Sequence, residues 1–89
     1  MEFNATYLPE FYLSLQKLPK KHGKQILKKI KTILGIKDLG IFRHIKPLAL
    51  HIGRATHRLK MSGYRIFVRV EGNNFEFHNI VKRGDAYKK

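Results

Sequence analysis

Three arginines and a tyrosine in the last third of the chain have the side chains best suited to chemistry on a phosphate. Arg58, Arg65 and Arg83 belong to segments that alternate like neighbouring strands, so their outward side chains could converge on one phosphate. Arginine binds phosphate through two parallel hydrogen bonds, and Tyr87, four residues after Arg83, could fold back and stack on a base. This set predicts an RNA site. The alternatives are a solvated strand face and, for Tyr87, an anchor packed on the core.

Charged and aromatic side chains around this set predict the surface along which RNA would lie. Between residues 64 and 70 every second residue is apolar and should face the helices, which leaves Arg65, Phe67 and Arg69 on the opposite, open face. Lys60 should point outward from the preceding strand, and Lys82 ends the last one. We therefore predict a cationic sheet face with one exposed aromatic ring, on which RNA contacts Lys60, Phe67, Arg69 and Lys82.

The charge of the chain supports an anionic partner. Its 89 residues include 19 Lys and Arg against 6 Asp and Glu, a formal net charge of +13. Nucleic acid is the first candidate, an acidic protein the second and an anionic membrane a distant third, because so large an excess repels itself without a polyanion. A soluble basic domain without such a partner is the alternative.

Several classes of chemistry find no support in the sequence. Cysteine is absent, which excludes disulfides and thiolate nucleophiles. The five histidines lack a short ligand spacing, so no metal is expected. No paired-acid, serine-triad or glycine-rich phosphate-loop pattern predicts another enzyme class or a small-molecule cofactor. The first residues lack a charged segment followed by an apolar run, so we expect no signal peptide. No run of about 18 apolar residues is present either, so we expect a cytoplasmic protein that does not enter a membrane.

The first half of the chain predicts one strand and two helices. Residues 3–7 alternate between apolar and polar like a short strand, and residues 8–18 repeat their apolar side chains at helical spacing as far as Pro19. Residues 20–36 form a second helix with an apolar stripe and a face of lysines. That lysine face is either a solvated surface, a contact for phosphates or the landing site of an acidic partner.

The second half predicts a sheet. Residues 37–53 are weakly patterned and are expected to form a loop with a short strand near residues 48–51. Alternation then predicts strands at 55–60, 64–71 and 75–82. The fold class that follows is α+β, in one domain over residues 1–89. It has an N-terminal strand, a two-helix hairpin, and then an antiparallel sheet of three or four strands with the helices on one face.

The chain resembles the RelE/ParE superfamily of bacterial toxins from type II toxin–antitoxin systems. The resemblance runs over nearly the whole chain, and its most specific part is a set of three motifs: His57-Arg58-Leu59-Lys60, Ser62-Gly63-Tyr64-Arg65 and Lys82-Arg83-Gly84-Asp85-Ala86-Tyr87. It implies a fold like that of the microbial ribonucleases and a cognate antitoxin protein. In the RelE branch it implies metal-independent cleavage of mRNA in the 30S A site of the ribosome, which inhibits translation.

The resemblance also implies roles for individual residues. In such an endoribonuclease the ribose 2′-OH attacks the adjacent phosphate, so Arg65 would hold the phosphate, Arg83 would stabilise or protonate the leaving group, and Tyr87 would stack on or orient the nucleotide. Arg58 stands where the RelE type has a catalytic lysine, and arginine is a poor general base. The base is then Tyr87, His57, His78 or a group of the ribosome.

Two other functions stay open at this point. The ParE branch shares the fold and inhibits DNA gyrase without cutting RNA, but usually lacks the Arg and Tyr set found here. A non-catalytic nucleic-acid-binding module would account for the charge alone and predicts salt-dependent binding without a cleaved product.

Overall fold

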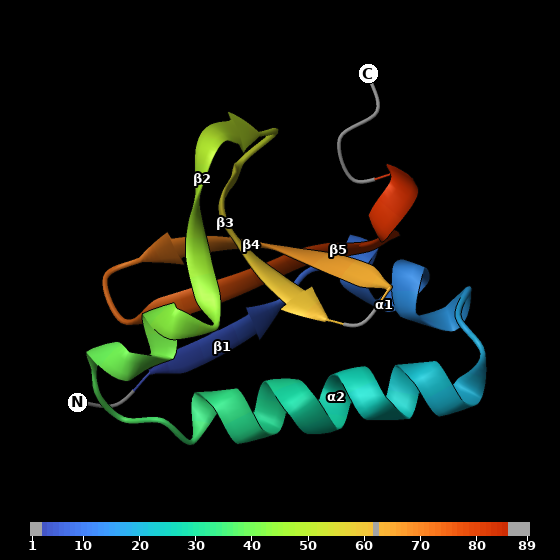
Figure 1. Ribbon diagram of the computed structural model, residues 1–89, viewed down its shortest axis with the longest axis horizontal. Coiled ribbons are helices and arrows are strands. Elements are labelled where there is room, and N and C mark those ends of the chain that lie inside the picture. The colour runs from blue at the N-terminus through green and yellow to red at the C-terminus, as the bar shows by residue number, and fades with distance from the viewer. Residues whose placement is uncertain (1–2, 62, 86–89) are drawn as a thin grey trace.

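A computed structural model describes residues 3–61 and 63–85 of the chain. One strand and two helices come first, followed by a short 3-10 helix, four strands and a second 3-10 helix (Figure 1). Their bounds are β1 Asn4–Tyr7, α1 Pro9–Gln16, α2 Lys20–Leu34, η1 Leu39–Arg43, β2 Ile45–Ile52, β3 Ala55–Met61, β4 Tyr64–Glu71, β5 Asn74–Lys82 and η2 Arg83–Asp85.

The five strands form one mixed sheet in the order β1-β5-β4-β3-β2. The predicted α+β class is confirmed, and β2 to β5 pair antiparallel as expected. The first strand differs from the prediction because β1 adds to the edge of the sheet parallel to β5, with Asn4 opposite Asn74. The connection between β1 and β5 contains both helices and the strands β2 to β4, so it is long enough to allow a parallel pair.

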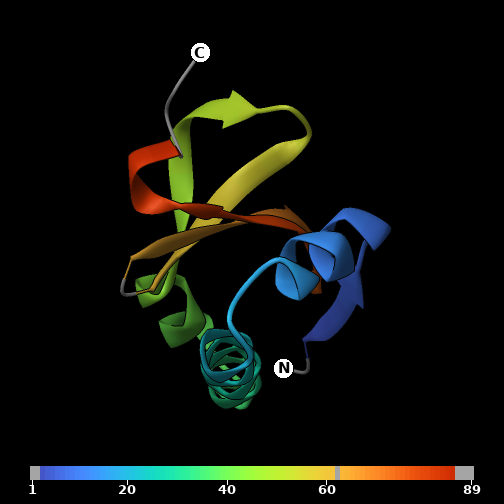
Figure 2. The same ribbon diagram turned by 90° about the vertical axis from the view of Figure 1, so that its right-hand side faces the viewer.

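The sequence of α2 explains which face it buries. Ile26, Ile30 and Ile33 recur at helical spacing and are almost fully buried, while the lysines of the helix lie on its exposed side. Leu27, which belonged to the predicted apolar stripe, keeps 43% of its surface exposed. Figure 2 shows α2 end-on along one side of the strands with α1 beside it. Within the described residues, no helix is long and apolar enough to cross a membrane.

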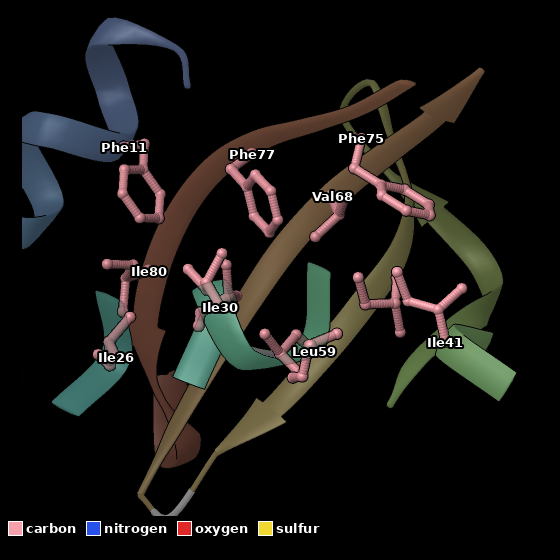
Figure 3. Close-up of a cluster of buried hydrophobic side chains, with 12 residues drawn as sticks. Phe11, Ile26, Ile30, Ile41, Leu59, Val68, Phe75, Phe77 and Ile80 are labelled. Atoms are coloured by element: carbon pink, nitrogen blue, oxygen red, sulfur yellow. The ribbon is translucent and has the colours of Figure 1, made fainter. Parts of the chain in front are cut away.

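The main core fills the space between these helices and the sheet (Figure 3). Ile66 and Val68 of β4 are fully buried there, as the alternation of this strand predicts. Phe11 of α1 lies against Phe77 of β5, with ring centroids 6.0 Å apart, and so fixes α1 to the sheet. The buried members of this core are Phe11, Ile26, Ile30, Ile33, Ile41, Ile45, Leu59, Ile66, Val68, Phe75, Phe77 and Ile80.

Strand β2 is longer than expected and changes the opposite face of the sheet. It begins at Ile45 and not near residue 48, and it tolerates Pro47 because it is an edge strand. The end of β2 and the start of β3 form an arm, which lies on the side of the sheet opposite α2 (Figure 1). Leu48 from this arm, together with Ala55 and Val81, packs on Phe67.

The prediction that Phe67 is an exposed aromatic ring is therefore wrong. Phe67 keeps only 3% of its surface exposed, because the arm covers the face on which it lies. The register between β4 and β5 also shifts between Phe67 and Val68, which bends the sheet at this point. Alternation placed Phe67 on the correct face but could not reveal that another strand covers it.

Candidate nucleic-acid interface

Arg65 is the charged residue that the fold buries, within the described part of the chain. It keeps 6% of its surface exposed, where we had expected an open position. In the sheet it stands between Lys60 of β3 and Val81 of β5. Its guanidinium donates a hydrogen bond to the main-chain carbonyl of Tyr64 at 3.0 Å. The ion pairs among the described residues are Arg69–Glu71 and Glu76–His78, so no described carboxylate neutralises Arg65.

Arg69 lies on the same strand in a different environment. Its Nε donates to the carboxylate of Glu71, and its other guanidinium nitrogen donates to the carbonyl of Arg54 at 3.0 Å. These contacts tie β4 to the start of β3 and use much of the donor capacity that Arg69 would offer to a phosphate. The predicted RNA contact at Arg69 stays a prediction.

A hollow of about 250 Å³ gathers cationic side chains around Arg58. We call it the basic hollow; it is lined by Arg43, His44, Lys46, Arg58 and Lys60. Lys46 of β2 stands directly opposite Arg58 of β3 in the sheet, and Lys60 follows two residues further on the same face. With four permanent cations and no carboxylate in its lining, this hollow attracts phosphate by charge alone.

A second hollow, of about 390 Å³, lies where α2, the β3–β4 connection and the end of β5 meet. We call it the hairpin hollow; its lining residues are His22, Gln25, Ile26, Met61, Gly63, Tyr64, Lys82, Arg83 and Gly84. The N–H of Arg83 donates to the carbonyl of Gly63 at 2.9 Å, which fixes the start of η2 against the connection. Gly63 adopts a φ of 75° there, a conformation that glycine reaches without strain.

The structure places the three arginines on neighbouring elements but not in one hollow. Arg58, Arg65 and Arg83 come from β3, from β4 and from the residue after β5, which are adjacent in the sheet as expected. They do not share one hollow, because Arg58 lines the basic hollow and Arg83 lines the hairpin hollow. Likewise, Lys60 lines the basic hollow and Lys82 lines the hairpin hollow. Tyr87 lies outside the described residues, so its predicted role is untested.

The two histidines named as possible bases occupy other places. His57 lies on the helix side, with its ring 5.8 Å from that of Phe42 and its Nδ1 hydrogen-bonded to the Thr56 hydroxyl at 2.8 Å. Burial, and to a smaller extent the nearby His51, lower its pKa from the ordinary value of 6.5. His78 bonds to Glu76 at 2.7 Å. Neither lines the basic hollow or the hairpin hollow.

Sequence reasoning missed two groups of site residues. The basic hollow includes Arg43, His44 and Lys46, which fell in the segment predicted as a loop; only the pairing of β2 with β3 brings them to Arg58. The second group is the pair His22 and Tyr64, joined by a hydrogen bond of 2.7 Å between Nδ1 and the hydroxyl. They are 42 residues apart, and no sequence pattern marks such a tertiary contact.

A metal site is not visible in this arrangement. Among residues 3–61 and 63–85, no three His, Asp or Glu side chains gather in a way that could hold an ion. The cationic lining of both hollows would repel a metal and attract an anion.

Solved structures with the same fold include toxin–antitoxin complexes. The chain is similar to the RelBE2 toxin–antitoxin complex from Mycobacterium tuberculosis (TM-score 0.70, 16% identity, covering 93% of this chain and 100% of that one). It is also similar to the archaeal RelE–RelB complex from Pyrococcus horikoshii OT3 (TM-score 0.69, 21% identity, covering 97% and 100%). A third similar structure is YafQ from E. coli strain BL21(DE3), with a TM-score of 0.70, 13% identity, and coverage of 98% and 100%.

No family model and no curated protein matches the sequence. At identities between 13% and 21%, the three similar structures show that this chain has the RelE fold over nearly its entire length. What the fold is used for here has to be argued from its residues.

Proposed function

We propose that this chain is the toxin of a type II toxin–antitoxin system and a metal-independent, ribosome-dependent mRNA endoribonuclease. The similar structures support the first part, because RelE toxins solved with their RelB antitoxins share its fold. The second part rests on the chain's own side chains.

The observation that carries the proposal is the burial of Arg65, which keeps 6% of its surface exposed. A buried cation without a carboxylate costs several kcal/mol, and natural proteins keep such a group mainly where it has a function. Arg65 has one main-chain carbonyl as its described partner, and its cross-strand neighbour Lys60 adds to the positive field. A phosphate of RNA would supply the missing charge and accept the remaining N–H groups in pairs.

The other predicted site residues are given roles around the phosphate that Arg65 binds. In the proposal Arg65 holds the scissile phosphate, and Arg83 stabilises the charge that develops on the leaving 5′-oxygen. Arg58 and the basic hollow around it hold the neighbouring backbone, with Lys60 and Lys82 as further contacts. Tyr87 stacks on or orients the nucleotide. Phe67 is left out, because a ring with 3% exposure offers no face for stacking.

The proposed antitoxin binds the same cationic face. With 19 Lys and Arg against 6 Asp and Glu, the chain keeps a net charge of +13 that its own carboxylates do not compensate. An antitoxin with an acidic or amphipathic helix across the arginines would block RNA by occupying its place. An antitoxin bound elsewhere would contradict inhibition by occlusion.

Primer extension on mRNA from cells that express the chain tests the proposal. We expect new 5′ ends at fixed positions within codons, together with growth arrest. Both should disappear in Arg83→Ala, whose side chain is exposed and therefore not needed for folding. Lys17→Ala removes one exposed cation outside both hollows and is the control that should leave the cuts in place.

The same cells separate the alternatives. Growth arrest without new 5′ ends, together with reduced DNA supercoiling, would replace the ribonuclease by a gyrase inhibitor of the ParE type. A chain that causes no arrest and binds RNA in a salt-dependent way would be a nucleic-acid-binding module.

A further inference from the structure

We propose that the hairpin hollow binds one nucleotide of the RNA next to the cut, with its base against Tyr64 and its phosphate on Lys82 and Arg83. As a subsite for the sequence around the cut, this inference rests on the ribonuclease function proposed above. The binding itself can be measured without any cleavage. It would make the hairpin hollow the place where this chain distinguishes one base from another.

The size and lining of the hairpin hollow fit a nucleotide. Its volume of about 390 Å³ falls in the range of small-ligand sites, roughly 300 to 1,000 Å³. Ile26, Met61 and the ring of Tyr64 give it an apolar wall, while the remaining lining is polar or glycine. An apolar wall beside a few polar groups is the usual composition of a site for an aromatic, charged ligand such as a nucleotide.

One end of the hairpin hollow is suited to a phosphate. Lys82 and Arg83 are adjacent and exposed, and none of the nine residues that line the hollow is acidic. The hydrogen bond from the N–H of Arg83 to the carbonyl of Gly63 fixes the main chain that carries these two cations. Two cations without a competing carboxylate are available for charge-assisted hydrogen bonds to phosphate oxygens.

The apolar wall is held in position by a contact with α2. The Tyr64 hydroxyl and His22 Nδ1 are hydrogen-bonded at 2.7 Å, and the two rings meet at 69° with centroids 5.6 Å apart. A ring whose orientation is fixed before binding loses little freedom when a base stacks on it. The pair therefore prepares the wall for a base and has no evident need in the core, because His22 is exposed.

The polar side chains from α2 can read the base. Gln25 is exposed and carries both a donor and an acceptor, so it can form paired hydrogen bonds with a base edge. His22 offers its second ring nitrogen on the same helix. Lys82 and Arg83 cannot distinguish bases, because phosphate is common to all nucleotides. Preference for a base should thus depend on Gln25.

An NMR titration of the ¹⁵N-labelled full chain with the four nucleoside 3′-monophosphates tests the binding. We expect saturable shifts at the amides of Gln25, Tyr64 and Gly84, and unequal affinities among the four bases. Inorganic phosphate and the nucleosides without phosphate should each bind at least about tenfold more weakly, because each retains one half of the contacts.

Two variants and two matched controls assign the contacts. Lys82→Ala should weaken the binding of all four nucleotides by about tenfold, which corresponds to the loss of one charge-assisted hydrogen bond. Gln25→Ala should make the affinities for the four nucleotides more nearly equal. Lys17→Ala and Gln16→Ala remove the same exposed side-chain types outside the hollow and should change neither quantity.

The outcomes separate this inference from the proposed function. Shifts that appear with inorganic phosphate as strongly as with nucleotides, or that lie around Arg58 and Lys46, would overturn the nucleotide site. mRNA cleavage without any nucleotide-induced shift at the hairpin hollow would reject this site and leave the ribonuclease. Saturable nucleotide binding there in a chain that cuts no mRNA would support the site and reject the ribonuclease.

Discussion

The two arginines of β4 occupy contrasting environments on one strand. Arg69 is partly exposed, is paired with Glu71 and donates to the carbonyl of Arg54, so it joins parts of the sheet. Arg65, four residues earlier, keeps 6% of its surface exposed and has no carboxylate partner among the described residues. A paired cation at the surface needs no ligand, whereas a buried and uncompensated one does.

The contrast extends to the ends of the molecule. At the β4–β5 turn, Glu71 and Glu76 pair with a nearby cation or histidine. The hairpin hollow, at the opposite end of these strands, and the basic hollow, beside β2 and β3, are lined by cations without a single acidic residue. Carboxylates therefore have partners at the β4–β5 turn, whereas the cations of the two hollows, where we propose that RNA binds, have no carboxylate beside them.

The strongest test of this comparison replaces Arg65 and Arg69, one at a time, by methionine. Arg65→Met should reduce mRNA cleavage by about 10²- to 10³-fold, as removal of one oxyanion-stabilising group does, because the phosphate loses its buried partner. The free energy of unfolding should stay the same or rise, because the variant no longer buries an unpaired charge. Quantitative primer extension and urea unfolding measure the two effects.

Arg69→Met is the matched control on the same strand. It should leave cleavage within a few-fold of wild type and should lower the free energy of unfolding slightly, since its ion pair is partly exposed to solvent. If both variants lost cleavage equally, or if Arg65→Met unfolded the chain, the difference drawn between the two arginines would be wrong.

Phe67 lies between these arginines, and its variant tests whether the ring serves RNA or the fold. Phe67→Leu should lower the free energy of unfolding by about 1 to 2 kcal/mol, because a buried ring that packs on Leu48 and Ala55 is replaced by a smaller side chain. The cuts on mRNA should keep their positions. Urea unfolding and primer extension provide the two readings, and lost cutting in a stable variant would return Phe67 to the RNA surface.

The case of Phe67 shows how far the sequence alone can lead. Alternation assigned the faces of β4 correctly, and the spacing of Ile26, Ile30 and Ile33 identified the buried side of α2, because both depend on local periodicity. Burial of Phe67 depends on an arm formed by β2, whose weak pattern and Pro47 concealed a strand. The length of β2 is set by its partner β3, which local residues do not encode.

For the candidate site too, local features could be predicted from the sequence, whereas contacts between distant segments could not. Arg58, Arg65 and Arg83 could be named from their segments, since side-chain parity and the pairing of strands that follow one another in the chain can be read from the sequence. Their separation into two hollows, the burial of Arg65 and the pairing of His22 with Tyr64 arise from contacts between distant segments. The parallel pairing of β1 with β5 was missed for the same reason.

A smaller effect is expected when a carboxylate at the β4–β5 turn is neutralised, so that this end of the sheet also carries an uncompensated cation. Glu71→Gln breaks the ion pair with Arg69, whose partners are 31% and 63% exposed at the side chain, so stability should fall by no more than about 0.5 kcal/mol. The released Arg69 and the added net charge should strengthen RNA binding by a few-fold at low salt and not at high salt. Binding to a non-cleavable RNA at two salt concentrations provides the measurement, and equal gains at both would contradict an electrostatic cause.

The smallest effect concerns His57, which lies on the helix side of the sheet, away from both hollows. Because burial and His51 lower its pKa below 6.5 in the folded chain, the unfolded chain takes up this proton first as the pH falls. Stability linked to His57 is therefore complete above about pH 6.5 and is lost as the pH falls toward the lowered pKa. His57→Gln should remove part of the decrease in urea midpoint between about pH 7.5 and 5.5.

Cleavage should respond differently to the same substitution. His57 contacts Phe42 and Thr56 and lines neither hollow, so the positions of the mRNA cuts should be the same with His57→Gln as with wild type. A variant that folds with the expected change in pH dependence but has lost its cuts would make His57 the missing base, and the reaction would then have to reach across the sheet. Because His57 lies within β3 on the helix side and lines neither hollow, we expect the cuts to remain.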